Sequence, residues 1–492
     1  MRSCLLRHAE ILTRPDVLPY ALFVLAIVVY SGALFLLSLP VGWITPDMLK
    51  EYMGTLHFEN KVAHFWYACV VSCALAVAAC VLWWLGLYRK GQVLLASPVL
   101  PARHERWLVL AIGLALIVLA KAPFLPDEGG DYTGFVKGWF DYIRNQGVWR
   151  AYGTSFSNYT PFYTYLLGIA AVLTPHDASP LIPVKLVTLA GEVVAALAVY
   201  RLVGLRYSKQ SLVPLLAPLS LPLVPTVLIN GISAAQCDIW HTAFLLWAMY
   251  WFVCDRPALG MVGVALAVSF KIMGALIAPF MLALLLRGRT PWTYLIILPL
   301  VYLALTVPCL LEGRPIADML FIYSNQFYTY GSLANNSANP YWFVPNELYA
   351  QVLTPGIVLS ALVALAYAVR TAPKLSEGNV EIMLLCAALG MALLFFTMPK
   401  MHDRYLFAAE IFVWVLMFMR PHLWLVALLF QVASLSSYIG FLMLYQNIFP
   451  LSYEARMPYA VLMNAVGIAL LAYEWWQLPD TPPNAAEMQE YA

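Results

Sequence analysis

Charged residues are scarce in this sequence. Asp, Glu, Lys and Arg make up 11% of the 492 residues, against roughly 25% in an ordinary soluble domain. The formal net charge is only +2 and the basic residues are scattered singly, which argues against nucleic acid as a partner. Because 62% of the residues are hydrophobic, the chain has more apolar surface than a soluble fold can bury. The composition therefore predicts an integral membrane protein.

The cysteines show neither the spacing of metal ligands nor that of a disulfide framework. Most of the eight fall inside apolar runs: Cys4, Cys69, Cys73, Cys80, Cys237, Cys254, Cys309 and Cys386. Free cysteines in such runs behave as small apolar side chains, so we predict packing roles for them. The acidic loop segment also lacks a histidine-containing metal pattern. We expect no metal ion and no cofactor.

Long apolar runs, in contrast, recur from residue 17 to residue 476. A helix needs about 20 mainly apolar residues to cross the hydrocarbon core, and we expect roughly thirteen such helices in one all-α polytopic domain. Several candidates are short or interrupted by proline, which is tolerated where a helix lines a cavity. The candidate spans are 17–39, 63–87, 107–124, 160–174, 182–204, 212–229, 238–254, 258–286, 292–311, 351–370, 380–398, 405–419, 421–445 and 457–476.

Basic residues near the ends of these spans indicate orientation, because cytoplasmic loops retain Lys and Arg. The segments before the first span and between the second and third are therefore assigned to the cytoplasm, which leaves 125–158 outside. We divide the chain into two N-terminal spans with their loop (1–106), a membrane domain (107–476) and a disordered tail (477–492). The basic residues used are Arg2, Arg7, Arg14, Arg89, Lys90, Arg103 and Arg106.

Two polar segments, 125–158 and 312–350, are long enough to carry chemistry. The first combines carboxylates with tryptophan and tyrosine, and the second is dense in aromatic residues and asparagine. Flat aromatic faces beside amide groups are a common mixture in sugar sites. The first segment also has apolar residues at helical spacing, which predict an external amphipathic helix lying on the bilayer surface: Phe135, Trp139, Phe140 and Ile143.

Short motifs follow one another in a specific order between residues 107 and 445. They are GGDY at 129–132, Trp139, Gly147, NYTPFYTYLLG at 158–168, Lys271 in LAVSFKIMGALIAPF, SANPYWFVP at 337–345 and KMHDRYLFAAE at 400–410. This order resembles the GT-C superfamily, in particular glycosyltransferases that use polyprenyl-phosphate sugars, similar to the glucosyl- and mannosyltransferases of lipid-linked glycan assembly. Ala408 departs from the usual proline of that pattern, and AAQCD at 234–238 departs from its Trp-Gly-Gln-Asp element. The resemblance implies a GT-C-type fold.

The resemblance also implies roles for individual residues. The catalytic base of these enzymes is a loop aspartate that follows a transmembrane helix, and Asp131 matches it; Asp127 and Glu128 are alternatives, since some relatives use an Asp-Glu pair. Their His-acid-basic-Tyr-Leu motif contacts the carrier phosphate, which assigns that role to His402 and Arg404. Lys271 joins them as a phosphate-binding residue. The expected substrate-binding residues are Tyr159, Tyr163, Asp238, Asn339 and Trp342.

The residue types, considered without the resemblance, also fit glycosyl transfer from a lipid phosphate. Moving a glycosyl group from a lipid phosphate to a hydroxyl requires a base for the acceptor proton and cations for the departing phosphate. Asp131 can act as the base of a single inverting displacement. The planar guanidinium of Arg404 suits a phosphate, and Lys271 and His402 can add charge or a proton donor.

Each of these residues also has a structural interpretation. Loop carboxylates can be merely solvated, and Lys271 can snorkel to a nearby interface. His402 and Arg404 follow the end of a span, where basic residues often anchor a helix. Glu192 and Asp238 lie in apolar segments, where each can be a hydrogen-bonding group between helices. The aromatic residues of the second polar segment can form an interfacial belt.

We predict a membrane glycosyltransferase that moves a hexose from a polyprenyl-phosphate donor to a lipid-linked or glycan acceptor on the non-cytoplasmic face. The short loops favour a bacterial inner membrane, with the endoplasmic reticulum membrane as the alternative, and we expect a monomer. The alternative function is a flippase or transporter of lipid-linked sugars, whose broken helices would also line a cavity. A non-catalytic scaffold would need neither Lys271 inside a span nor the His402–Arg404 group.

Overall fold

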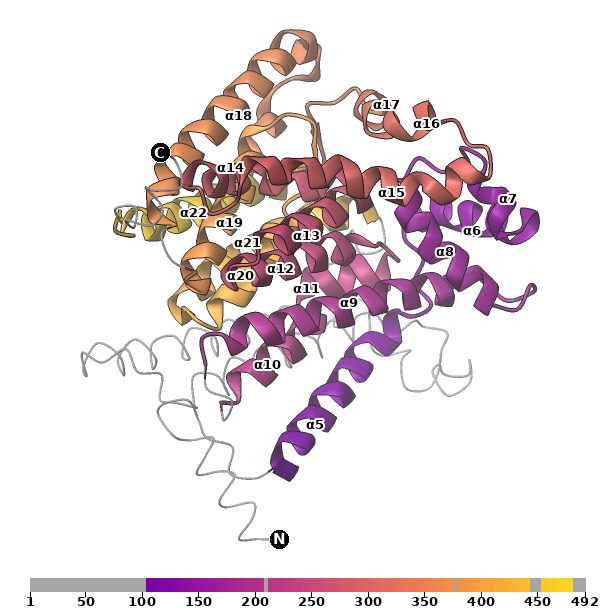
Figure 1. Cartoon of the computed structure of the whole chain (residues 1–492), viewed down its shortest axis with the longest axis horizontal. Coiled ribbons are helices and arrows are strands. Elements are labelled where there is room, and N and C mark those ends of the chain that lie inside the picture. The colour runs from indigo at the N-terminus through magenta and orange to yellow at the C-terminus, as the bar shows by residue number, and fades with distance from the viewer. Residues whose placement is uncertain (1–102, 208–210, 376–377, 443–452, 481–492) are drawn as a thin grey trace.

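The computed structural model describes residues 103–207, 211–375, 378–442 and 453–480, and these residues are almost entirely helical (Figure 1). Two short strands, β1 (Ala334–Asn335) and β2 (Met401–His402), pair in parallel. The predicted all-α class is confirmed for this part of the chain. The predicted spans at 17–39 and 63–87, most of the predicted tail and the first four cysteines lie outside the described residues.

Each predicted span within the described part coincides with one or more helices. The main ones are α5 (Arg103–Lys121), α8 (Pro161–Leu173), α9 (Leu181–Gly204), α12 (Asp238–Val253), α13 (Pro257–Phe270), α14 (Ala278–Arg287), α15 (Ile297–Leu311), α18 (Tyr349–Thr371), α19 (Val380–Thr397), α20 (Phe407–Met417), α21 (Trp424–Leu442) and α22 (Tyr453–Trp476). Among the described residues, five helices, counted with the turns that extend them, are long and apolar enough to cross a membrane, and a bent pair would make a sixth. The predicted count of thirteen is therefore not confirmed.

Helix breaks explain part of this difference. The segment Val213–Leu223 meets Pro225–Ser233 at an angle of 45°, because prolines lack the N–H group that a continuous helix needs. Helix α13 ends at Phe270, Lys271 is extended, and the chain resumes as a 3-10 turn over Ile272–Ile277. Broken helices of this kind are tolerated inside a membrane protein where other segments cover them. Both breaks point polar groups into the interior.

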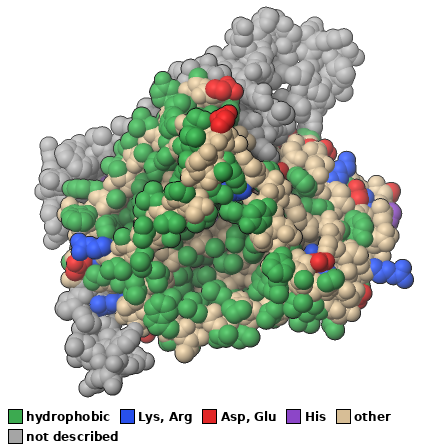
Figure 2. All heavy atoms as spheres, turned by 90° about the horizontal axis from the view of Figure 1, so that it is seen from above, with side chains coloured by type: hydrophobic (Ala, Val, Ile, Leu, Met, Phe, Trp, Pro, Cys, Tyr) green, Lys and Arg blue, Asp and Glu red, His purple; other side chains and the backbone are tan. Residues whose placement is uncertain are grey.

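The apolar core surrounds α20, in which every residue is buried. Helix α12 packs against α9 and α13, and α19 packs against α20 and α22. The outer helices α15 and α18 instead leave large apolar side chains such as Leu300, Leu311 and Leu362 exposed. Figure 2 shows one face of the molecule with hydrophobic side chains over most of its area and charged ones mainly near its edges. Such exposed apolar surface indicates contact with lipid.

The predicted amphipathic helix exists, as α6 (Lys137–Gln146), but its apolar face does not lie free for a bilayer. Trp139, Phe140 and Ile143 are buried in a cluster that includes Tyr163 and Leu167 of α8. A row of large apolar residues gains as much from burial against another helix as from contact with lipid. The prediction that this helix lies on the bilayer surface is therefore corrected.

The two polar segments meet at one end of the molecule. The short helices α6 and α7 (Val148–Tyr152) of the first segment lie close to α16 (Ile316–Leu320) and α17 (Ile322–Thr329) of the second (Figure 1). Ser155 donates a hydrogen bond to the carboxylate of Asp318 at 2.5 Å. Tyr152, Cys309 and Met319 form a small buried cluster nearby. The segments that sequence analysis selected for chemistry thus form one region.

Candidate functional site

Asp131 is positioned by a loop that packs tightly onto the broken segment before α12. A Cβ atom added to Gly129 would lie 2.4 Å from the carbonyl oxygen of Ala234, so only glycine fits there. The Nζ atom of Lys185 donates hydrogen bonds of 2.6 to 2.8 Å to three backbone carbonyl groups of the same loop. These contacts hold Asp131 directly in front of residues 234–238.

Gln236 faces Asp131 from that segment. The side-chain Nε2 atom of Gln236 donates a hydrogen bond to Oδ2 of Asp131 at 3.1 Å. The backbone carbonyl of Gln236 accepts a hydrogen bond from the hydroxyl of Thr188 at 2.8 Å. The preceding residue, Ala235, is fully buried and has a positive φ of 54°. That left-handed conformation is costly for alanine, and strain of this type persists only where surrounding contacts enforce it. The turn fixes the direction of the Gln236 side chain.

Asp238 opens α12 and is fully buried. Its carboxylate accepts a hydrogen bond of 2.7 Å from Nδ2 of Asn230 and forms an ion pair with Lys271. Lys271 can reach it because the chain is extended at the break after α13. The same ammonium lies 5.2 Å from the ring centroid of Tyr159, within cation–π range. The predicted residues Lys271, Asp238 and Tyr159 are therefore in contact.

Arg404 comes from the other end of the chain, in the loop between α19 and α20. Strand β2 pairs with β1, which ties this loop to the second polar segment. Lys400, which has a positive φ of 63°, donates hydrogen bonds to the carbonyl of Tyr330 and the hydroxyl of Tyr349 at 2.6 and 2.7 Å. The tight turn directs the following residues toward Asp131.

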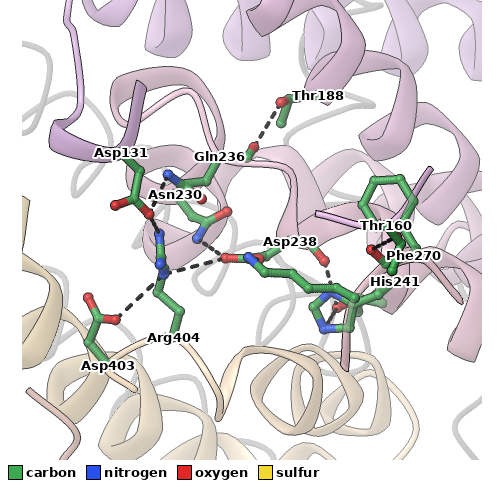
Figure 3. A network of polar contacts seen from close by, with 12 residues as sticks. Asp131, Thr160, Thr188, Asn230, Gln236, Asp238, His241, Phe270, Asp403 and Arg404 are labelled. Carbon is green, nitrogen blue, oxygen red and sulfur yellow. Dashed lines mark hydrogen bonds and ion pairs between the residues drawn. The ribbon is translucent and has the colours of Figure 1, made fainter. Parts of the chain in front are cut away.

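The guanidinium of Arg404 lies among three carboxylates (Figure 3). It donates a hydrogen bond of 2.6 Å to Asp131, and its Nε atom is 3.9 Å from Asp238 and 3.5 Å from Asp403. With Lys271, the cluster thus holds two cations and three carboxylates. We call these five residues the charge cluster.

Burial and charge alter the protonation of the loop residues in and around this cluster. Burial alone would raise the pKa of Asp131, but the adjacent Arg404 outweighs it and holds that pKa below its usual value. Burial raises the pKa of Asp403 to about 7, in spite of Arg404. Burial and Arg404 together lower the pKa of His402 to about 3. At neutral pH, Asp131 is therefore a carboxylate and His402 a neutral imidazole.

His402 and the two predicted tyrosines lie around the charge cluster. The ring of His402 is 4.8 Å from that of Tyr330, and the ring of Tyr159 is 5.1 Å from Trp139 and 5.4 Å from Tyr163. Tyr163 is 1% exposed and packs against Phe270. Tyr163 therefore packs against Tyr159, and the ring of Tyr159 is the one within cation–π range of Lys271.

The structure places the remaining predicted residues elsewhere. Ser233 donates a hydrogen bond of 2.9 Å to Asp127, while Glu128 is exposed. Asn339 is fully buried and its amide donates to the carbonyls of Phe395 and Met398 at the end of α19. Trp342 packs edge-on against Tyr453. Asn339 and Trp342 thus have packing contacts that explain their presence without a substrate.

Sequence reasoning did not select Gln236, Asn230 or Asp403 as site residues. Gln236 and Asp403 stand inside two of the motifs, next to Asp238 and Arg404, and that adjacency is a signal that could have found them. Asn230 belongs to the proline-broken segment, where the helix is interrupted and helical spacing does not predict that it faces Asp238. As to metals, the described residues include no group of three or more His, Cys, Asp or Glu side chains that could hold an ion.

A comparison with protein families supports one class of activity. Residues 134–287 match the family model described as alpha-(1->6)-mannopyranosyltransferase, N-terminal domain, a mannosyltransferase family of the GT-C type. No curated protein matches the sequence. The matched region is about a third of the chain and contains Tyr159, Asp238 and Lys271, but not Asp131 or Arg404. The match confirms the resemblance drawn from the motifs, and it identifies the chain as a membrane glycosyltransferase similar to the alpha-mannosyltransferases of this family.

Proposed function

We propose that the protein transfers a hexose, in the first instance mannose, from a polyprenyl-phosphate carrier to a lipid-linked or glycan acceptor on the non-cytoplasmic face of the membrane. One observation carries the proposal. A partly buried carboxylate on a loop, Asp131, contacts a cation, Arg404, and a second cation, Lys271, is held in the same cluster by Asp238. A base beside paired cations is what transfer from a lipid phosphate requires.

In this proposal the two cations bind the donor phosphate. Arg404 offers a planar fork that can grip two phosphate oxygens, and Lys271 adds a compact positive charge. Asp238 and Asn230 keep Lys271 in place, because Asp238 binds its ammonium and Asn230 completes the hydrogen bonding of Asp238. Neutral His402, at the edge of the cluster, can donate an N–H hydrogen bond to a phosphate oxygen.

Donor binding would also activate the base. Arg404 now donates to Asp131, and a phosphate that attracts Arg404 away removes the interaction that lowers the pKa of this carboxyl. Burial, the largest contribution, is then opposed mainly by the weaker effect of Lys271, so the pKa of Asp131 rises and Asp131 becomes a stronger base. Gln236 keeps its hydrogen bond to Asp131 and preserves the orientation of the carboxylate.

The transfer itself is an inverting displacement. The acceptor hydroxyl oxygen attacks the anomeric carbon from the face opposite the phosphate, and its proton passes to Asp131. The bond between the anomeric carbon and the phosphate oxygen breaks, and the polyprenyl phosphate leaves with its charge stabilised by Arg404 and Lys271. The new glycosidic bond has the opposite anomeric configuration to that of the donor.

The test is sugar transfer by the purified protein in detergent, from a panel of polyprenyl-phosphate sugars to lipid and glycan acceptors. We expect Asp131→Asn to lower the rate about 10²- to 10⁴-fold, the usual contribution of a general base. Asp141→Asn is the matched control, because Asp141 lies in the same polar segment but pairs with Arg144 at 2.6 Å.

Each result has a definite meaning. An inverted product that depends on Asp131 supports the whole proposal. Normal transfer by a folded Asp131→Asn protein would remove Asp131 from the mechanism and direct attention to Asp127 and Glu128. If the wild type transfers no sugar but moves labelled lipid-linked sugars across vesicle membranes, the protein is a transporter.

A further inference from the structure

A cavity of about 420 Å³ lies where the two polar segments face each other. Helix α6 and residues 155–158 form one wall, and residues 314–329, with α16 and α17, form the other. Pockets for small molecules typically measure about 300–1,000 Å³. The cavity is therefore large enough for one or two sugar rings, and none of the residues of the charge cluster lines it.

The walls of this cavity combine aromatic rings with neutral polar groups. Trp139 and Phe156 supply aromatic surface, while Asn158, Asn325 and Thr329 supply amide and hydroxyl groups. A sugar ring presents apolar C–H faces and hydroxyl edges, so it matches both kinds of group. A polyprenyl chain would match only the aromatic part and would leave the amides without partners.

The two charged residues of the lining, Arg314 and Asp318, narrow the choice of ligand. Arg314 is 3% exposed, and its Nε atom is buried without a hydrogen-bond partner among the described residues. Leaving such a donor unpaired is costly, and the guanidinium of this lining residue has further N–H groups to offer a ligand. Asp318, on the same lining, carries the opposite charge and can accept hydrogen bonds from a ligand. A neutral ligand with many hydroxyl groups can accept from Arg314 and donate to Asp318.

The cavity is connected to the charge cluster through two aromatic rings in contact. Trp139 lines the cavity, and its ring centroid is 5.1 Å from that of Tyr159. The Tyr159 ring in turn lies 5.2 Å from the Nζ atom of Lys271. Two rings, Trp139 and Tyr159, therefore lie between a ligand in the cavity and Lys271, one of the groups assigned to the donor phosphate.

We propose that this cavity binds the acceptor saccharide, a neutral hydroxyl-rich glycan, and that Arg314 and Asp318 determine which acceptor is used. The inference rests on the proposed function, since it assigns the second substrate of the same reaction. It separates the two substrates by charge: the anionic carrier goes to the charge cluster, and the neutral glycan goes to the cavity.

The experiment measures acceptor use and donor use separately. Wild type, Asp318→Asn and Arg314→Gln are compared for the KM of acceptor, the KM of donor, and hydrolysis of the donor by water without acceptor. We expect the acceptor KM to rise about tenfold or more, the loss of about one buried charged hydrogen bond, with donor KM and hydrolysis unchanged. Arg150→Gln on α7, an exposed arginine outside the lining, is the matched control.

A binding measurement without donor keeps the two proposals distinguishable. Soluble oligosaccharides, beginning with an α-1,6-linked mannobiose, are titrated into wild type and variants while tryptophan fluorescence is recorded. Asn325→Ala, an exposed lining residue on α17, serves where Arg314→Gln fails to fold. Weaker saccharide binding by these variants supports the inference even if no donor is turned over. Unchanged binding and acceptor KM in both Asp318→Asn and Asn325→Ala, or no saccharide binding by wild type, would overturn it; absent transfer with normal binding would overturn the proposed function alone.

Discussion

Lys121, the last residue of α5, and Glu192 of α9 form a buried ion pair. Lys121 lies ten residues before Asp131 of the charge cluster. The paired side chains are 6% and 3% exposed, and Nζ of Lys121 is 2.8 Å from Oε1 of Glu192. The numbers of positive and negative charges are equal, and the pair joins two helices that are far apart in sequence. A buried pair of this kind is complete in itself and needs no ligand.

The charge cluster differs in that its groups are not all matched. Three acidic side chains share two cations, and burial raises the pKa of one of them, Asp403, to about 7. Around them, Oδ2 of Asp403, Oδ1 of Asn230 and Nδ1 of His241 are buried without a hydrogen-bond partner among the described residues. Unsatisfied buried polar atoms cost free energy, and a catalytic role or a bound ligand or water is a common explanation for them. The comparison teaches that the charge count and bonding of a buried group, rather than its burial, separate a helix contact from a site.

The largest expected effect comes from breaking the matched pair. Glu192→Leu leaves Lys121 buried without its partner, so we expect the free energy of unfolding to fall by about 3–5 kcal/mol. The double variant Lys121→Met/Glu192→Leu should recover most of that loss, and its turnover per folded molecule should equal that of the wild type. Thermal unfolding in detergent and the transfer assay check both points. Lost turnover in a stable double variant would contradict the purely structural role.

Changing Arg404 tests the charge cluster, where we expect an effect on turnover rather than on stability. Arg404→Lys keeps the charge but loses the planar fork, so we expect turnover to fall about 10²- to 10³-fold. The matched control is Arg420→Lys, because Arg420 is also partly buried and pairs with Glu381 at 3.0 Å and Glu474 at 3.4 Å, away from the cluster. Equal losses in the two variants would show that stability, not phosphate binding, is affected.

A pair of adjacent glycines tests how strictly the cluster is positioned. Gly129→Ala must displace the loop from Ala234, since the added Cβ would lie 2.4 Å from its carbonyl oxygen. We expect turnover to fall about 10²-fold, as for a 1 Å misplacement of a catalytic group. Gly130→Ala is the control, because its added Cβ has no atom within 4 Å. Comparable rates for both variants would disprove tight positioning of Asp131.

The smallest expected effect is a pH dependence of stability. The pKa of Asp403 is raised to about 7 by burial, so the folded protein holds a proton that the unfolded chain has lost above about pH 4. The stability this proton confers is present below that pH and is lost as pH rises through about 7, at no more than about 1.4 kcal/mol per pH unit. Asp403→Asn should abolish this slope. Thermal unfolding of both proteins from pH 5 to pH 8 measures it, and identical slopes would contradict the raised pKa.

The sequence predicted the helices well because apolar length is a local property. Almost every predicted span ends within a few residues of a helix, from 182–204 against Leu181–Gly204 to 380–398 against Val380–Thr397. The count of spans was less certain, since breaks such as the one at Lys271 depend on tertiary contacts. The surface of α6 was assigned to lipid because a stripe of aromatic residues has the same spacing whether it meets a bilayer or α8.

The predicted site residues fall into two groups in the structure, those that come together in the charge cluster and those that pack elsewhere. Asp131, Asp238, Lys271 and Arg404 were selected from four distant motifs, and the structure brings them into one cluster. The roles assigned to them remain predictions. Asn339 and Trp342 belong to an equally polar and aromatic motif, yet their contacts are with α19 and Tyr453. Composition does not distinguish a side chain that caps a helix from one that meets a substrate.

The ion pair between Asp131 and Arg404 joins residues 273 positions apart. At translation rates of about 5–20 residues per second, Asp131 emerges tens of seconds before its partner. During that interval Asp238 and Lys271, only 33 positions apart, can already pair. Synthesis of the chain therefore sets the order of assembly: the pair in the early helices can form first, and a nascent or truncated chain that ends before residue 404 cannot complete the charge cluster.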